Sequence, residues 1–176
     1  KVVCVAGNSI ETPRLLLMSK SNMFPNGLAN SSDQVGRNYM RHLTASVYAT
    51  FDKPVNFYRG ETMAGFLADE VKNNPKRGFV GGFYMETLAL GPSFMGAFLE
   101  PGGWGKKFAN MMDAYQNMAG MWIGGEDMPQ STNRITLGTA KDQHGMPAPN
   151  VHFDDHPNDV AMTNYAWKNV SAIYKA

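Results

Sequence analysis

The start of the chain places an apolar run, a glycine and a helix start next to one another. Residues 2–6 read Val-Val-Cys-Val-Ala, an apolar run without alternation that is typical of a parallel strand covered on both faces. Gly7 follows, and Thr12 and Pro13 then predict the N-cap and first residue of a helix over 13–19. A strand, a tight turn and a helix start in this order form an α/β unit whose turn can lie against a nucleotide.

The composition excludes several classes of protein. A chain of 176 residues with 43% hydrophobic side chains can bury a substantial core. The net charge is +1 and only 18% of the residues are charged, so we expect no nucleic-acid partner. Cys4 is the only cysteine, and its place in the apolar run predicts a small buried core residue. No apolar run approaches the roughly 18 residues that a membrane-spanning helix needs.

The first half of the chain predicts a mixture of helix and strand after a polar loop over 20–36. Residues 44–51 alternate and are rich in β-forming residues, so they predict a strand. A short helix is expected over 61–72. Residues 78–90 carry aromatic and β-branched side chains between glycines, which indicates an interrupted strand.

The second half begins with apolar residues at three- and four-residue steps from residue 104 to residue 122, which predict a helix ended by Gly124 and Gly125. Arg134–Leu137 is expected to pair with Asn150–Phe153 as a long-looped antiparallel pair. Asn158 predicts the N-cap of a last helix, with Asp159 in its first turn. The residues expected on the buried face of that helix are Met162, Tyr165, Ala166, Val170 and Ile173.

Three strings carry a resemblance to a known family. They are Ala-Gly-Asn-Ser-Ile-Glu-Thr-Pro-Arg-Leu-Leu-Leu at 6–17, Pro-Asn-Gly-Leu-Ala-Asn-Ser-Ser-Asp-Gln-Val-Gly-Arg-Asn-Tyr-Met-Arg-His at 25–42, and Asn-Arg-Ile-Thr-Leu with Gly-Met-Pro at 133–137 and 145–147. The first resembles the second signature of the glucose-methanol-choline (GMC) oxidoreductases. The second is similar to the continuation found in the gluconate, sorbitol and glucose dehydrogenase branch, and the third to the substrate-domain hairpin of the family.

The resemblance implies an α+β fold, in which an antiparallel-sheet substrate domain with flanking helices is attached to a small piece of an α/β, Rossmann-like FAD-binding domain. Residues 1–43 are expected to form part of the FAD-binding domain. Residues 44–176 are expected to form the substrate-binding domain, with its C-terminal end incomplete. The chain is thus expected to be an internal segment that lacks the N-terminal FAD fingerprint and the C-terminal catalytic block of the family.

The activity implied by the resemblance is oxidation of an alcohol or sugar hydroxyl to a carbonyl by an FAD-dependent dehydrogenase. Two alternatives stay open, namely a GMC-type oxidase that uses oxygen and a catalytically inactive structural or binding fragment. The implied partners are the alcohol or sugar substrate, the remainder of the same polypeptide, and a cytochrome or quinone acceptor. A protein of the gluconate dehydrogenase-like branch would face the periplasm, and otherwise a cytoplasmic location is expected.

The resemblance also implies a set of cofactor-binding residues and no catalytic residue in this segment. Ala6, Gly7 and Asn8 are expected beside the ADP half of FAD, with Thr12 at the helix start. Asn38 and His42 are further cofactor-binding candidates. His42 lies in a Gly-Arg-Asn-Tyr-Met-Arg-His run. Its neighbours Arg41 and Leu43 depart from the family pattern, so a hydrogen-bonded structural histidine is the alternative.

Residues 152–159 contain imidazole and carboxylate side chains at close spacing, which is one pattern of a metal site. In a strand His152 and Asp154 share one face and Asp155 takes the other, and Pro157 then turns the chain. We therefore interpret this segment as a strand end followed by a helix cap, and we predict no metal.

Overall fold

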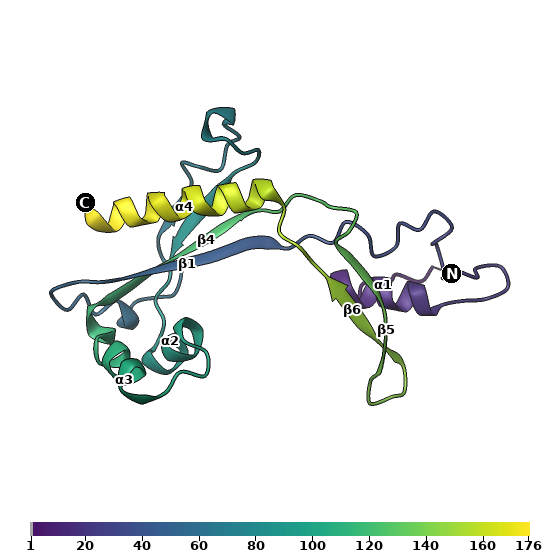
Figure 1. Cartoon of the computed structure of the whole chain (residues 1–176), viewed down its shortest axis with the longest axis horizontal. Coiled ribbons are helices and arrows are strands. Elements are labelled where there is room, and N and C mark those ends of the chain that lie inside the picture. Colours follow the sequence, from purple (N-terminus) through teal and green to yellow (C-terminus); the bar gives the residue numbers. More distant parts are fainter. Residues whose placement is uncertain (1) are drawn as a thin grey trace. The chain divides into compact units, whose positions relative to one another are not determined.

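The computed structural model of the chain describes residues 2–176, which form two compact units (Figure 1). The first unit combines residues 2–41 with residues 127–156, and the second combines residues 42–126 with residues 157–176. The chain therefore passes from the first unit to the second, returns to the first, and ends in the second. The expected α+β class is confirmed by the mixture of helices and antiparallel strands.

The first unit packs one helix on one hairpin. Helix α1 (Asn8–Met18) lies on strands β5 (Arg134–Lys141) and β6 (Pro147–His152). The strands are antiparallel, with Ile135 opposite Val151, and a bulge interrupts the register before Lys141. The antiparallel pairing that the sequence predicts here is confirmed. The loop over 20–36 is also confirmed, because it contains turns and no helix or strand.

Asn133 and Ile135 occupy the centre of the first unit. Both residues are fully buried. The Asn133 side chain donates to the carbonyl oxygen of Asp154 at 3.0 Å and accepts from its amide at 2.8 Å, so the buried amide is satisfied on both sides. The amide of Ile135 donates to the carbonyl oxygen of Gly36 at 2.7 Å, which ties the loop before residue 37 to strand β5.

The second unit is a four-stranded antiparallel sheet. The strand order is β1-β4-β3-β2, with β1 at His42–Thr50, β4 at Met118–Glu126, β3 at Phe83–Thr87 and β2 at Phe66–Leu67. Helix α4 (Pro157–Lys175) lies along one side of the sheet, and α2 (Pro92–Leu99) and α3 (Gly105–Asp113) lie on the other (Figure 1). Short 3₁₀ helices occupy Phe57–Arg59, Pro75–Arg77 and Tyr115–Asn117.

The main core of this unit lies between the sheet and α4. Alternate residues of the strands point toward the helix, as the two-residue period of a strand requires. The core residues from the strands include Leu43, Phe83, Met85, Met121 and Ile123, and those from α4 are Met162, Ala166 and Val170. The strand predicted over 44–51 is confirmed as β1, and the last helix is confirmed with its buried face. Ile173 is the exception, because it is 42% exposed.

The helix predicted from residue 104 to residue 122 is wrong in its second half. Helix α3 ends at Asp113, and β4, the second strand of the sheet, begins at Met118. The rings of Tyr48 and Tyr84 lie across Gly120 and Gly124 of β4, where a Cβ atom would overlap them. Neighbouring strands thus supply the packing that the glycines lack, and this tertiary contact outweighs the helical period of the sequence.

Two further predictions are wrong. Residues 61–72 contain turns and the two-residue strand β2 in place of a helix. The strand predicted over residues 2–7 is not formed, and Val2 and Val3 are 89% and 88% exposed. A buried strand needs a hydrogen-bonded neighbour and covered faces, and no described strand pairs with these residues. For the same reason Cys4 is exposed and is no core residue of the described structure.

No helix within residues 2–176 has the length and apolar character needed to cross a lipid bilayer.

Candidate cofactor site

Helix α1 begins earlier than the sequence predicts, because Asn8 and not Thr12 caps it. Asn8 has a φ of +77°, which its short polar side chain tolerates. Its Oδ1 accepts hydrogen bonds from the amides of Ile10 and Glu11 at 2.8 and 2.9 Å. Thr12 lies inside the helix and its Oγ1 accepts from the amide of Gly7 at 2.8 Å. The helix start is therefore fixed by its own side chains before any ligand binds.

Gly7 leaves the backbone of this turn open. Its φ of −90° is available to any residue. A Cβ atom at this position would meet only Glu11 and Thr12, at ordinary contact distances of 3.5 Å. Neither the backbone conformation nor the packing of the described residues requires glycine here. A bare backbone at an exposed turn is the feature that lets a ligand approach closely.

A surface hollow of about 270 Å³ lies beside the start of α1. Its lining includes Ser9 and Pro13 from the helix, and Asn38 and Tyr39 from the segment before β1. Asn38 is exposed and has a φ of +55°. The structure thus brings one of the predicted loop residues next to the predicted helix start, within the same unit.

His42 lies in the second unit, as the first residue of β1 opposite Glu126. The residue is exposed, and no hydrogen bond of its imidazole is found in the part of the chain that the structure describes. Its position therefore offers no support for the alternative of a hydrogen-bonded structural histidine. A cofactor role for His42 stays a prediction, as it does for Ala6, Gly7, Asn8, Thr12 and Asn38.

Arg14 fastens the helix to the loop between β5 and β6. Its Nε donates to the carbonyl oxygen of Pro147 at 2.8 Å, and one terminal nitrogen lies 2.5 Å from Oδ2 of Asp142. The other terminal nitrogen pairs with Glu11 at 3.0 Å. The hydrogen bond from Arg14, together with those from the amides of Met146 and His144, lowers the pKa of Asp142 to about 2.

This arrangement predicts an acid-sensitive first unit. Because the pKa of Asp142 is lower in the folded chain than its ordinary value of 3.8, the carboxylate stabilises the fold above that value. That contribution should be lost as the pH falls through about 2. Thermal unfolding of the wild type and the Asp142→Asn variant is measured as the pH is lowered from 3.8 to about 2. The midpoint temperature of unfolding should fall less for the variant than for the wild type. Equal falls would contradict the pairing.

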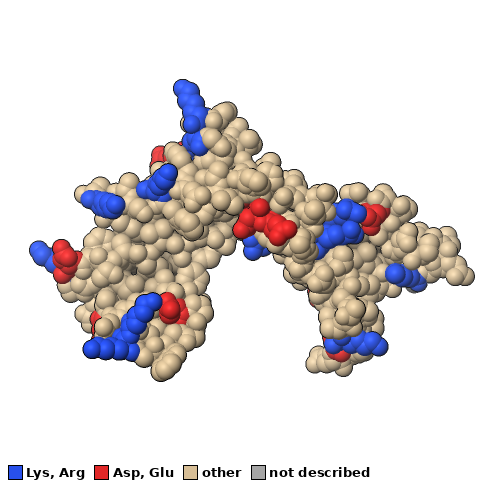
Figure 2. Space-filling view, viewed as in Figure 1, with Lys and Arg blue, Asp and Glu red and all other residues tan. Residues whose placement is uncertain are grey.

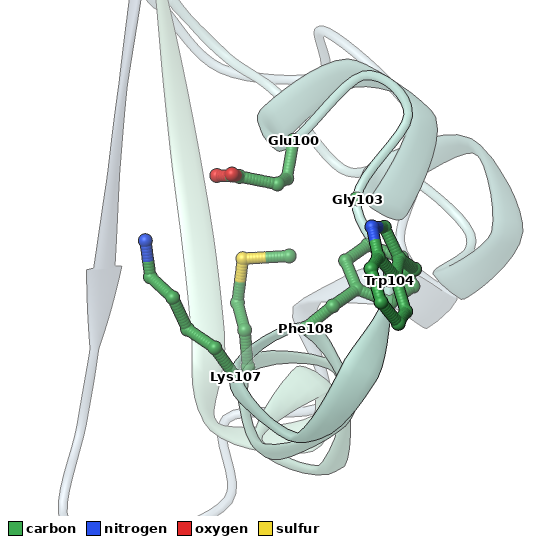
Figure 3. A pocket seen from close by; sticks show the side chains of 6 residues that line it. Glu100, Gly103, Trp104, Lys107 and Phe108 are labelled. Carbon is green, nitrogen blue, oxygen red and sulfur yellow. The ribbon is translucent and has the colours of Figure 1, made fainter.

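A second hollow, of about 150 Å³, lies on the α2–α3 side of the second unit (Figure 3). Trp104 and Phe108 lie together on one side of it, and the Glu100 and Lys107 side chains extend toward the other side. Trp104 is 87% exposed. None of the predicted site residues lines this hollow.

Figure 2 shows that the charged groups on the face drawn are scattered and of both signs, with large uncharged areas between them.

The sequence reasoning missed the sheet face that points away from α4. This face carries Trp122 of β4 and Glu86 of β3 side by side in the register. Because residues 118–122 read as helix, nothing in the sequence indicated that these two side chains share a surface.

The described residues contain no group of three or more histidine, cysteine, aspartate or glutamate side chains that could hold a metal ion. In the segment that resembled a metal site, Nε2 of His152 lies 3.0 Å from Oδ2 of Asp154. The two side chains thus share a face, as the strand period requires.

Comparison with known proteins gives the family. A profile of the family described as GMC oxidoreductase matches residues 129–176. A 2-methyl-1,2-propanediol dehydrogenase of Mycolicibacterium austroafricanum is 38% identical over an alignment that covers 100% of this chain and 33% of that protein. This chain belongs to the GMC oxidoreductase family.

Two further relatives resemble this GMC chain. The fructose dehydrogenase large subunit of Gluconobacter japonicus is 31% identical, with 88% of this chain and 29% of that protein covered. A 6'''-hydroxyparomomycin C oxidase of Streptomyces lividus is 28% identical, with 94% and 28% covered. The chain therefore spans about a third of the length of the curated relatives it matches.

Proposed function

We propose that the polypeptide carrying this GMC sequence is an FAD-dependent dehydrogenase that oxidises an alcohol or sugar hydroxyl to a carbonyl. The observation that carries the proposal is the 38% identity with a diol dehydrogenase along the whole chain. The two relatives named as dehydrogenases are 38% and 31% identical, and the one named as an oxidase is 28% identical, which favours a dehydrogenase. A bound flavin would supply the hydride acceptor for this chemistry.

The first unit fits one part of such a cofactor. Gly7 leaves room for a ligand at an exposed turn, and the hollow beside α1 brings Asn38 together with Ser9 and Pro13 of that helix. We assign Ala6, Gly7 and Asn8 to the ADP half of FAD, with Asn38 beside them. Thr12 acts on the cofactor indirectly, since its hydroxyl holds the amide of Gly7. No catalytic residue is assigned within this segment.

The exposed apolar surface of the first unit supports a role as part of a larger FAD-binding domain. Ile135 is the only fully buried apolar residue that the structure shows in this unit, whereas Val2, Val3 and Met23 are more than 80% exposed. Exposed apolar surface of this kind is typical of a contact with another part of a protein. We propose that the remainder of the polypeptide covers residues 2–6 and completes the strand that the sequence predicts there.

The experiment that tests this function compares electron acceptors. The purified polypeptide should contain flavin and oxidise 2-methyl-1,2-propanediol or a sugar alcohol with an artificial dye as acceptor. A cytochrome or quinone would be the natural acceptor. Rapid peroxide formation with oxygen alone would support an oxidase. If the whole polypeptide contained no flavin and oxidised no alcohol, the proposal would be contradicted. Residues 1–176 alone, in contrast, are expected to bind no flavin and to oxidise no alcohol.

Gly7→Ala tests the cofactor assignment without disturbing the fold. The backbone and packing accept a methyl group at this position, so the thermal midpoint should not change. A methyl group between the turn and FAD should weaken flavin binding by about tenfold, the effect of losing one good polar contact. Flavin retention during dialysis measures this.

Gly91→Ala is the matched control, because Gly91 has a φ of −63° and open space around it in the second unit. Its flavin affinity should equal that of the wild type. Equal flavin affinity of the Gly7→Ala variant and the wild type would remove Gly7 from the site.

A further inference from the structure

One row of side chains crosses the face of the second-unit sheet that points away from α4. The register places Glu86 of β3 between Phe66 of β2 and Trp122 of β4, and Ser46 of β1 follows Trp122. These side chains point away from the α4 core because their neighbours along the strands point into it. A carboxylate, a hydroxyl and two aromatic rings therefore share one line across the sheet.

The carboxylate oxygens of Glu86 accept no hydrogen bond from any residue that the structure describes. Its side chain is half-buried, yet no hydrogen bond or ion pair of its carboxylate is found among residues 2–176. Two other carboxylates of this unit have partners: Glu70 lies 2.5 Å from Arg77, and Glu126 accepts from the amide of Gly82 at 3.2 Å. A half-buried carboxylate has already lost part of its hydration, so it gains from a ligand that donates hydrogen bonds.

The rings beside Glu86 are held in place by other aromatic side chains. Trp122 packs against Phe98 of α2, with ring centroids 5.8 Å apart. Phe66 is 58% exposed and leans on Tyr84, with centroids 5.2 Å apart and an angle of 30° between the rings. Fixed ring surfaces contact the C–H groups of a ligand without losing much conformational entropy.

We propose that Glu86 determines specificity for polyhydroxylated substrates, by accepting hydrogen bonds from two of their hydroxyl groups. This inference rests on the proposed oxidation of alcohols and adds the substrate class. Each carboxylate oxygen accepts from one hydroxyl group, so a diol or sugar alcohol can use both. Trp122 and Phe66 contact the carbon chain between those hydroxyl groups. A monoalcohol makes no second hydrogen bond and leaves part of the carboxylate unsatisfied.

The test compares two alcohols that differ in one hydroxyl group, 2-methyl-1,2-propanediol and 2-methyl-1-propanol. Their dissociation constants for the whole polypeptide are measured by ligand-observed NMR titration, which needs no turnover. The wild type should bind the diol more tightly. Glu86→Gln should weaken diol binding by about tenfold, the loss expected for one charged hydrogen bond. Its binding of the monoalcohol should change by less than about twofold, as for a surface substitution.

Glu61→Gln is the matched control, since Glu61 is an exposed carboxylate elsewhere in the same unit. It should leave the binding of both alcohols unchanged. The inference is overturned if the wild type binds the two alcohols equally or binds neither, or if Glu86→Gln affects both equally or has no effect. The proposed function fails separately, if bound flavin is not reduced by any alcohol, and the binding result still decides the role of Glu86.

Discussion

Phe83→Ala is expected to lower the free energy of unfolding of the second unit by about 3–5 kcal/mol, the range for a large aromatic side chain removed from a core. Phe83 is 1% exposed, and its ring lies 6.1 Å from Tyr165 of α4 and 6.4 Å from Phe79. Removing the ring leaves a cavity between the sheet and the helix. Urea unfolding of the chain, followed by tryptophan emission, measures this, because all three tryptophans lie in the second unit.

Phe83→Leu is the matched variant for this prediction. It keeps most of the apolar volume, so it should cost less than about 1.5 kcal/mol. Equal losses for the two variants would contradict a packed core at this position. A loss below about 1 kcal/mol for Phe83→Ala would show that α4 does not cover β3 as described.

Gly36→Ala is expected to destabilise the first unit by about 3 kcal/mol. Gly36 has a φ of +82°, a conformation that costs other residues about 1–2 kcal/mol. A methyl group there would also overlap the backbone carbonyl of Ile135, and such overpacking adds about 1–3 kcal/mol. Hydrogen exchange of the Ile135 amide reports the change directly, because this amide donates to the carbonyl oxygen of Gly36.

The control for this variant is again Gly91→Ala, which should leave exchange at Ile135 unchanged. Gly36 also lines the hollow beside α1, together with Asn38. Gly36→Ala should therefore lower the flavin content of the whole polypeptide as well. Wild-type protection of Ile135 in the variant would contradict the close approach of the loop to β5.

The sequence predicted the elements whose local pattern agrees with their tertiary contacts. The residues of strand β1 alternate between the sheet face that packs against α4 and the opposite face. Met162, Ala166 and Val170 follow the helical period of α4. Strand β4 was mistaken for helix, since its partners Tyr48 and Tyr84 are distant in the sequence. The local sequence pattern of a strand does not show which residues of other strands will pack against it.

The cofactor-binding residues stay a prediction. The family resemblance indicated the turn at Gly7 and Asn8, and the structure places Asn38 in a hollow with Ser9 and Pro13 of the helix that follows this turn. The cap was assigned to Thr12 because Ser, Thr and Pro are common at helix starts, whereas Asn8 starts the helix through a positive φ that no sequence pattern reveals. Glu86 was not recognised, because its significance depends on the register between β3 and β4.

We propose that the polypeptide carrying this GMC chain transfers a hydride from an alcohol to bound flavin. Anaerobic titration of the purified polypeptide with 2-methyl-1,2-propanediol tests it most directly, with the visible absorption band of the flavin as the readout. We predict that the diol bleaches this band until all bound flavin is reduced, and that adding a dye acceptor restores it. A bound flavin that dithionite reduces but that no diol, sugar alcohol or monoalcohol reduces would contradict the claim.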